Sequence, residues 1–172
     1  LPMKIKNAMI DVETLAVDWN AVVLTIGAVK FNPFTNDIDS KFHVKLDVDS
    51  QIEKGRVTDE RTLAWWGQQE ESVKSKAFSP EGRIDVGEAL NKLSAWAADT
   101  HRVWCQGPSF DFPIVDSLYR QYDRQIPWKF WNQRDARTVT GLLAEDIKNK
   151  IDFNAHDAAE DCIAQAKCVQ YV

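Results

Sequence analysis

Long apolar stretches and targeting segments are missing from this chain of 172 residues. No run approaches the roughly 20 apolar residues that a transmembrane helix requires, and the N-terminus lacks the apolar core of a signal peptide. The seven glycines and six prolines are scattered, so no linker is indicated, and no internal repeat is found. We therefore expect one cytoplasmic domain over residues 1–172 without a membrane partner. Leu1 and Pro2, ahead of a plausible start at Met3, are expected to be remnants of expression.

Cysteine is scarce, and positive charge is outweighed by negative charge. Cys105, Cys162 and Cys168 form no C-x-x-C motif and cannot all pair within one chain, which favours reduced thiols and argues against a structural zinc site. The net charge of −5 speaks at first against a polyanionic partner. Acidic residues that hold divalent cations nevertheless attract phosphate, so bulk charge does not decide the substrate class.

The order of predicted elements indicates an α/β fold. Residues 8–14, 22–31 and 42–46 are β-prone runs with short connections, which predicts three strands in an antiparallel meander. Further along the chain we predict a strand at 102–106, a fifth strand at 126–131, and helices at 58–69, after Asp85, after Asp111, at 136–144 and at 158–169. A meander followed by alternating helices and strands predicts a central mixed five-stranded sheet that is flanked by helices.

Two carboxylates stand at the end of the first predicted strand. Asp11 and Glu13 are two residues apart, so in a strand both side chains point to the same face. The pair on its own also fits a solvated strand end that is neutralised by Lys or Arg. Asp111 follows the fourth predicted strand and opens a helix, where it can act as a helix cap or face the first two acids. Only the combination of the acids discriminates between these readings.

A histidine and a fourth carboxylate lie near the C-terminus. His156 and Asp161 are five residues apart, so a regular helix separates them by about 140°. They converge only if His156 lies in the loop that enters the helix and Asp161 in the second turn, with Asn154 or Asp157 as cap. The alternative is an exposed helix acid and a loop histidine with local hydrogen bonds.

Together these residues have the chemistry of a phosphodiesterase. Asp11, Glu13, Asp111 and Asp161 offer the hard oxygen ligands that select Mg²⁺ or Mn²⁺ over zinc. Two such ions about 4 Å apart clamp the attacking and leaving oxygens of a phosphodiester. His156 has an unperturbed pKa near 6.5, which suits a general base near neutral pH.

The motifs resemble those of a known enzyme superfamily. Asp11-Val12-Glu13-Thr14, Phe110-Asp111 and the pair His156 and Asp161 resemble, in order and spacing, the three motifs of the DnaQ-like exonucleases with an H-x-x-x-x-D third motif (DEDDh). Residues 62–69, 107–114, 129–138 and 155–157 look like the corresponding segments of DexA-type phage exonucleases. One position departs from the pattern, because Gly107 stands where proofreading members carry Asn.

The resemblance implies an RNase H-like fold and 3′ to 5′ exonucleolytic release of nucleoside monophosphates, with a preference for single strands. Our first hypothesis for the substrate is single-stranded DNA. It implies that the four acids bind two Mg²⁺ or Mn²⁺ ions and that His156 is the general base. It also implies a phage or prophage enzyme, which would act in the cytoplasm of a bacterial host. An exoribonuclease, a non-catalytic nucleic-acid-binding module and an RNase H-like endonuclease are the alternatives.

Further residues are candidates for contacts with the substrate. Phe110 can stack on terminal bases or pack in the core. Adjacent tryptophans cannot share one helical face, so of Trp65 and Trp66 one is core and the other, which we take as Trp66, faces the substrate with Gln69. Arg137 can contact phosphate, or it can pair with Asp135. Thr14 and Ser109 are candidate hydrogen-bond donors to the terminal nucleotide.

Overall fold

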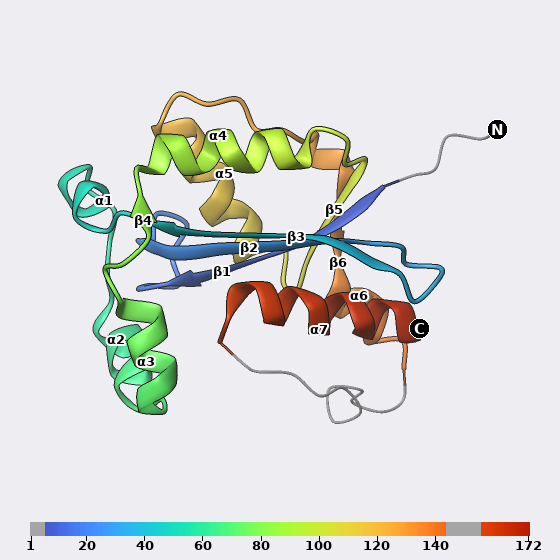
Figure 1. Cartoon of the computed structure of the whole chain (residues 1–172), viewed down its shortest axis with the longest axis horizontal. Coiled ribbons are helices and arrows are strands. Elements are labelled where there is room, and N and C mark those ends of the chain that lie inside the picture. The colour runs from blue at the N-terminus through green and yellow to red at the C-terminus, as the bar shows by residue number, and fades with distance from the viewer. Residues whose placement is uncertain (1–5, 144–155) are drawn as a thin grey trace.

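The computed structural model describes residues 6–143 and 156–172 of the chain, whose central sheet carries helices on both faces (Figure 1). Leu1, Pro2, Met3 and Asn154 lie outside the described residues, as does the predicted C-terminal end of the helix at 136–144. None of the helices in the described ranges is long and apolar enough to cross a membrane.

The sheet is mixed, and its centre is the predicted meander. Antiparallel pairing joins β1 (Asn7–Thr14) to β2 (Val23–Phe31) and β2 to β3 (Ile38–Leu46). The short strands β4 (Arg83–Ile84), β5 (Arg102–Cys105) and β6 (Gln133–Asp135) add in parallel, giving the order β4-β3-β2-β1-β5-β6. The mixed sheet is confirmed, and within residues 6–143 and 156–172 it has six strands in place of the five that we predicted.

One predicted strand is misplaced. The fifth strand was expected at 126–131, but Phe130–Asn132 forms a 3₁₀ turn and β6 begins at Gln133. Aromatic residues favour strands mainly because strands bury them. Phe130 and Trp131 are instead 78% and 60% exposed, so their residue type was a misleading signal. Two further helices, α1 (Asp49–Glu53) and α3 (Glu71–Phe78), were not predicted.

The helices form layers around the sheet (Figure 1). One face is covered by α4 (Val86–Ala97) and α5 (Asp111–Gln121), and the other by α6 (Ala136–Thr140) and α7 (Ala158–Tyr171). The helices α2 (Glu60–Gly67) and α3 lie together at one end of the sheet. As predicted, Asp85 caps α4 by accepting a hydrogen bond from the Glu88 backbone N–H, at 3.0 Å.

The alternation of side chains along β1 decides where its acids point. Ile10 and Val12 belong to the large core between the sheet and helices α4 and α5. Met9 belongs to the opposite core, with Cys162, Ala166 and Val169 of α7. Asp11 and Glu13 are in phase with Met9, so their carboxylates face α7 beyond the apolar end of that core.

A glycine lets α7 approach the sheet. Gly27 of β2 lies opposite Asp11 in the β1–β2 register. A methyl group at Gly27 would stand 2.3 Å from the carbonyl carbon of Ala158, so only glycine fits beneath the start of α7. The Cys162 thiol also donates to the Gly27 carbonyl, at 3.3 Å. The start of α7 is therefore held against the strand beside the two acids.

Candidate active site

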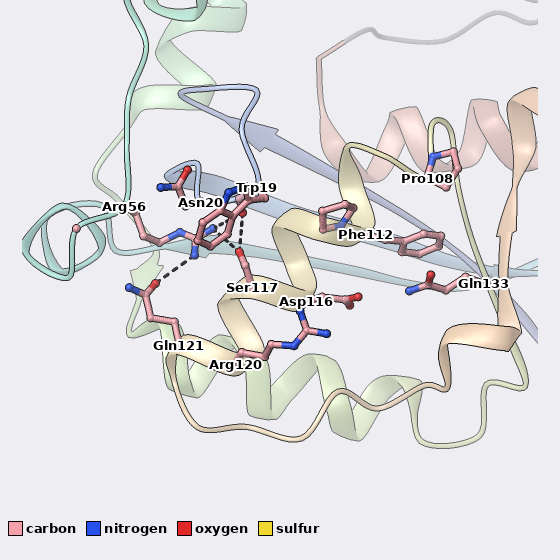
Figure 2. A pocket seen from close by; sticks show the side chains of 12 residues that line it. Trp19, Asn20, Arg56, Pro108, Phe112, Asp116, Ser117, Arg120, Gln121 and Gln133 are labelled. Atoms are coloured by element: carbon pink, nitrogen blue, oxygen red, sulfur yellow. Dashed lines mark hydrogen bonds between the residues drawn. The ribbon is translucent and has the colours of Figure 1, made fainter.

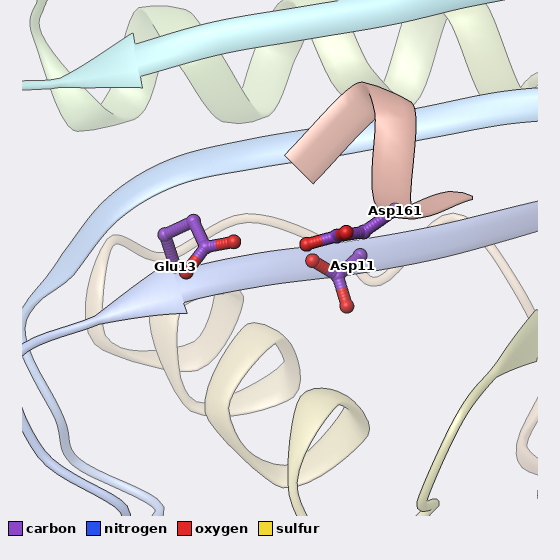
Figure 3. Close-up of side chains that lie close together, drawn as sticks. All are labelled: Asp11, Glu13 and Asp161. Carbon is purple, nitrogen blue, oxygen red and sulfur yellow. The ribbon is translucent and has the colours of Figure 1, made fainter. Parts of the chain in front are cut away.

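Three carboxylates from two distant parts of the chain meet at the carboxyl end of β1. One oxygen each from Asp11, Glu13 and Asp161 lies within 4.8 Å of the others. Figure 3 shows the two strand acids on one side of β1, with Asp161 directed at them from the helix above. The two-residue spacing thus places Asp11 and Glu13 on one face, as predicted, and α7 adds the third acid.

Asp111 completes the acidic group from the first residue of α5. Its side chain is 2% exposed, and Oδ1 accepts a hydrogen bond from the Val12 backbone N–H at 3.2 Å. The cap position of α5 is held by Phe110 and has no side-chain cap bond, so the helix-cap reading of Asp111 is not borne out. Asp111 is near enough to raise the pKa of both Asp11 and Glu13 by charge repulsion.

Burial and mutual repulsion oppose ionisation of this group. Burial is the largest cause that raises the pKa of Glu13 to about 8 and that of Asp111 to about 7. Burial first and the three neighbouring acids next raise the pKa of Asp11 well above its usual range. Four carboxylates of this kind ionise together only if positive charge enters among them, and divalent cations with oxygen preference fit that requirement.

His156 lies in the turn that precedes α7, as the predicted convergence requires. Its backbone N–H donates to Asp161 Oδ2 at 3.1 Å, and its φ of 68° is left-handed. Asp161 lies in the first turn of α7, one turn earlier than predicted, and Asp157 is the helix cap. The His156 ring meets Trp65 edge to face at 4.7 Å between centroids, and burial lowers the imidazole pKa.

A cleft of about 450 Å³ opens beside Glu13. Phe110 and Trp65 line it, and Trp65 is 40% exposed. Trp66 is only 2% exposed, packs in a small core beneath α2, and donates from Nε1 to the Thr14 carbonyl at 2.9 Å. Trp66 also lines the cleft, so its predicted contact with the substrate stays a prediction, but Trp65 presents the more exposed ring there.

The other predicted substrate contacts are placed less favourably. Thr14 lines the cleft, but its hydroxyl donates to the Ala16 carbonyl at 2.6 Å. Gln69 donates to the Trp65 carbonyl at 3.0 Å and is not among the cleft residues. Ser109 is exposed in the loop before α5. These three residues are not brought together around the cleft.

Arg137 is close to the acids. Its guanidinium lies beside Gly107 and lowers the pKa of Asp111 by its charge. Gly107 has a φ of 105°, a conformation that favours glycine, and Arg137 Nη1 is 3.4 Å from where a Cβ would stand. Asn at Gly107 would thus be strained, which accounts physically for the departure from the proofreading pattern. Asp135 accepts from the backbone N–H groups of Gly107 and Arg137, as the cap of α6.

One residue of the site was missed by the sequence analysis. Gln165 donates from Nε2 to Asp11 Oδ1, at 3.1 Å. It stands four residues after Asp161 on α7, and residues four apart share a helix face. That spacing from a candidate ligand was the available signal.

A second cavity, of about 680 Å³, lies along α5 outside the carboxylate group (Figure 2). Arg56, which is 4% exposed, forms part of its wall, and its guanidinium group donates to the carbonyls of Ala21 and Trp19 and to the side chains of Ser117 and Gln121. These bonds tie the β1–β2 connection to α5. Arg56 is therefore a structural residue of this cavity wall.

Comparison with known proteins agrees with this geometry. The family model of the 3′-5′ exoribonuclease Rv2179c-like domain matches residues 6–172. A relative, the exodeoxyribonuclease of Enterobacteria phage T4, is 28% identical over 200 residues, which cover 95% of this chain and 87% of that protein.

Solved structures share the fold at low identity. Escherichia coli Exonuclease I in complex with a dT13 oligonucleotide superimposes with a TM-score of 0.72 at 11% identity, over 98% of this chain and 41% of that chain. The nuclease domain of 3′hExo, a DEDDh family member bound to rAMP, gives a TM-score of 0.68 at 12% identity over 99% and 92%. The chain thus spans well under half of Exonuclease I but nearly all of the 3′hExo domain. With a family model matched from residue 6 to residue 172 and an RNase H-like fold of this kind, the chain belongs to the Rv2179c-like family of DnaQ-like 3′-5′ exonucleases.

Proposed function

We propose that this protein removes nucleoside monophosphates from the 3′ end of single-stranded DNA with the help of two Mg²⁺ or Mn²⁺ ions. The observation that carries the proposal is the meeting of Asp11, Glu13 and Asp161 within 4.8 Å, with Asp111 bonded to the strand beside them. The phage T4 relative is an exodeoxyribonuclease, and the Exonuclease I neighbour holds a single DNA strand, which supports DNA as the substrate.

The four acids would hold the cations. Their oxygen donors, their burial and their raised pKa values fit divalent ions, whose charge would permit all four to ionise. When bound, such ions polarise the phosphodiester and stabilise the charge that develops on its oxygens. Asp11 and Glu13 are fixed by the strand, Asp111 by its bond to Val12, and Asp161 by its bond to the His156 backbone.

His156 would take the proton from the attacking water. Its burial lowers the pKa, so the imidazole is neutral and able to accept a proton at neutral pH. The ring is in edge-to-face contact with Trp65, which lines the cleft. Trp65 and Phe110 line that cleft beside Glu13, and their faces would stack on the terminal base without regard to sequence.

Digestion of oligonucleotides labelled at the 5′ end tests the proposal. Single-stranded DNA in Mn²⁺ or Mg²⁺ should shorten one nucleotide at a time from the 3′ end, and chelator should abolish the reaction. Asp11→Asn should reduce the rate by orders of magnitude, while Asp18→Asn, which changes an exposed loop carboxylate, should not.

Other outcomes would contradict the proposal. If the Asp11→Asn protein is as active as the parent, the carboxylate group is not required for the reaction. Faster digestion of RNA than of DNA would make the protein an exoribonuclease. Internal cuts on a strand with a blocked 3′ end would make it an endonuclease.

A further inference from the structure

Gln165 is an uncharged polar residue of α7 whose side chain contacts Asp11 of β1. Its Nε2 donates to Asp11 Oδ1 at 3.1 Å, across 154 residues of sequence. The bond therefore ties the position of the Asp11 carboxylate to α7.

The same bond fixes how the Gln165 amide is oriented. A reversed amide would place Oε1 against Asp11 Oδ1, and two acceptors would repel each other. In the observed orientation Oε1 is buried and accepts no hydrogen bond from the part of the chain that the structure describes. A buried amide oxygen that accepts no hydrogen bond lowers the stability of the folded state. A donor that arrives with a ligand would relieve this loss.

The approach of α7 to the sheet keeps Gln165 in reach of Asp11. Gly27 admits the start of the helix against β2, and Cys162 bonds to the Gly27 carbonyl. Asp161 and Gln165 are one helical turn apart and so point from the same face toward β1. One helix thus brings a carboxylate to the acidic group and, beside it, an amide that orients another carboxylate.

We propose that Gln165 is a positioning residue of the metal site, in which Nε2 orients Asp11 and Oε1 accepts a hydrogen bond from a water that arrives with the cation. The inference rests on the proposed function, since it requires Asp11 to be a metal ligand. In this proposal Gln165 acts through Asp11 and does not itself bind the DNA. Its loss should therefore weaken cation binding and turnover while leaving the affinity for DNA unchanged.

Two measurements test the inference: the affinity for Mn²⁺ alone, by isothermal titration calorimetry, and the steady-state kinetics of oligonucleotide digestion. Gln165→Met keeps the approximate length of the side chain and removes both the Nε2 donor and the Oε1 acceptor. Removing a partner that orients a ligand typically costs about 10-fold to 100-fold in metal affinity or activity. We expect a loss of that size in Mn²⁺ affinity and in kcat, with KM for the oligonucleotide within about twofold of the parent.

Gln170→Met is the matched control. Gln170 lies further along α7 and donates to the carbonyls of Asn32 and Asp37, away from the acids. It should retain the Mn²⁺ affinity of the parent, and melting in chelator should show both variants folded. If Gln165→Met reduces folding, Gln165→Asn supplies the same test, because the shorter side chain keeps an amide but withdraws its N–H from Asp11, so Mn²⁺ affinity and kcat should again fall.

Asp11→Asn, titrated in parallel, separates the two claims. If Asp11→Asn loses Mn²⁺ binding and Gln165→Met binds as the parent does, the positioning role is overturned and the proposed function stands. If Asp11→Asn itself binds Mn²⁺ with the parent's affinity, both the proposed metal site and the positioning role of Gln165 are contradicted. Loss of Mn²⁺ affinity in Gln165→Met but not in Gln170→Met supports the inference.

Discussion

Gly27 of β2 and Ala158 at the start of α7 touch through their backbones, with no room for a side chain between them. The contact matters because Asp161 and His156 lie on either side of Ala158, and Asp11 lies opposite Gly27. The register of the sheet and the seating of one helix thereby determine how closely acids from the two ends of the chain approach each other.

Gly27→Ala should displace the start of α7. A methyl group 2.3 Å from the Ala158 carbonyl carbon has to push the helix away, because the obstructing atoms are backbone. We expect exonuclease activity to fall at least about 100-fold, since misplacement by about 1 Å can cost that much. Gly67→Ala is the control, because nothing lies within 4 Å of the position of its Cβ. Equal activity of the two variants would contradict the role of this contact.

The metal-free protein should lose stability as the pH rises. The pKa of Glu13 is raised from 4.5 to about 8 and that of Asp111 from 3.8 to about 7, so between these values the folded state holds protons that the unfolded chain has lost. The free energy of unfolding therefore falls across that interval. Melting in chelator should show Tm decreasing from about pH 5 to about pH 8, and Mn²⁺ should raise Tm more at the higher pH.

Glu13→Gln is the control for this pH dependence. It removes one of the raised groups, so its Tm in chelator should exceed that of the parent near pH 8 and respond less to Mn²⁺. A parent Tm that climbs with pH in chelator would show that the acids are not held in an unfavourable ionised state.

Much of the site followed from local patterns. Strand periodicity and the ends of strands are local properties of a sequence. The two-residue spacing of Asp11 and Glu13 and the position of Asp111 after a strand were therefore sufficient to predict that these three acids lie close together. The convergence of His156 with Asp161 depended on where α7 begins, and the sequence left Asn154 and Asp157 open as its cap, so Asp161 was placed one turn too late. The site roles of all these residues stay predictions that the experiments above address.

The rest depended on packing that the sequence does not display. Trp65 and Trp66 are adjacent, and only the docking of α2 against the sheet decides which is buried. Phe130 and Trp131 resemble strand residues but stay exposed in a 3₁₀ turn. Gln165 is an unremarkable helix residue until the sheet register brings Asp11 to it. In each case a contact between distant segments overrides the local preference.

Trp65→Ala should impair catalysis through His156. The substitution removes the ring that the imidazole packs against at 4.7 Å and one wall of the cleft. We expect kcat to fall and KM for the oligonucleotide to rise, each by about tenfold, since a stacked base is worth about 1–3 kcal/mol. Trp65→Phe should recover part of both. Trp131→Ala removes a more exposed tryptophan elsewhere and should leave the kinetics unchanged; a similar loss in that variant would point to a general effect of tryptophan removal.

Arg56→Met should destabilise the protein without involving the acids. It removes the buried donor to the Ala21 carbonyl, the donor to the Gln121 side-chain oxygen, and one of the two donors to the Trp19 carbonyl, which keeps its bond from Ser117. We expect the free energy of unfolding in urea to fall by about 2–4 kcal/mol. Arg120→Met, on the exposed side of α5, should change it by less than about 0.5 kcal/mol. Comparable stability of the two variants would argue against the structural role of Arg56.

The binding of cations by the four acids is tested most directly by anomalous diffraction from crystals grown with Mn²⁺. The account predicts two manganese peaks among the carboxylates of Asp11, Glu13, Asp111 and Asp161, and their loss in crystals of Asp11→Asn. Manganese concentrations that support DNA cleavage but give no peak at these carboxylates, or peaks only elsewhere on the molecule, would contradict it.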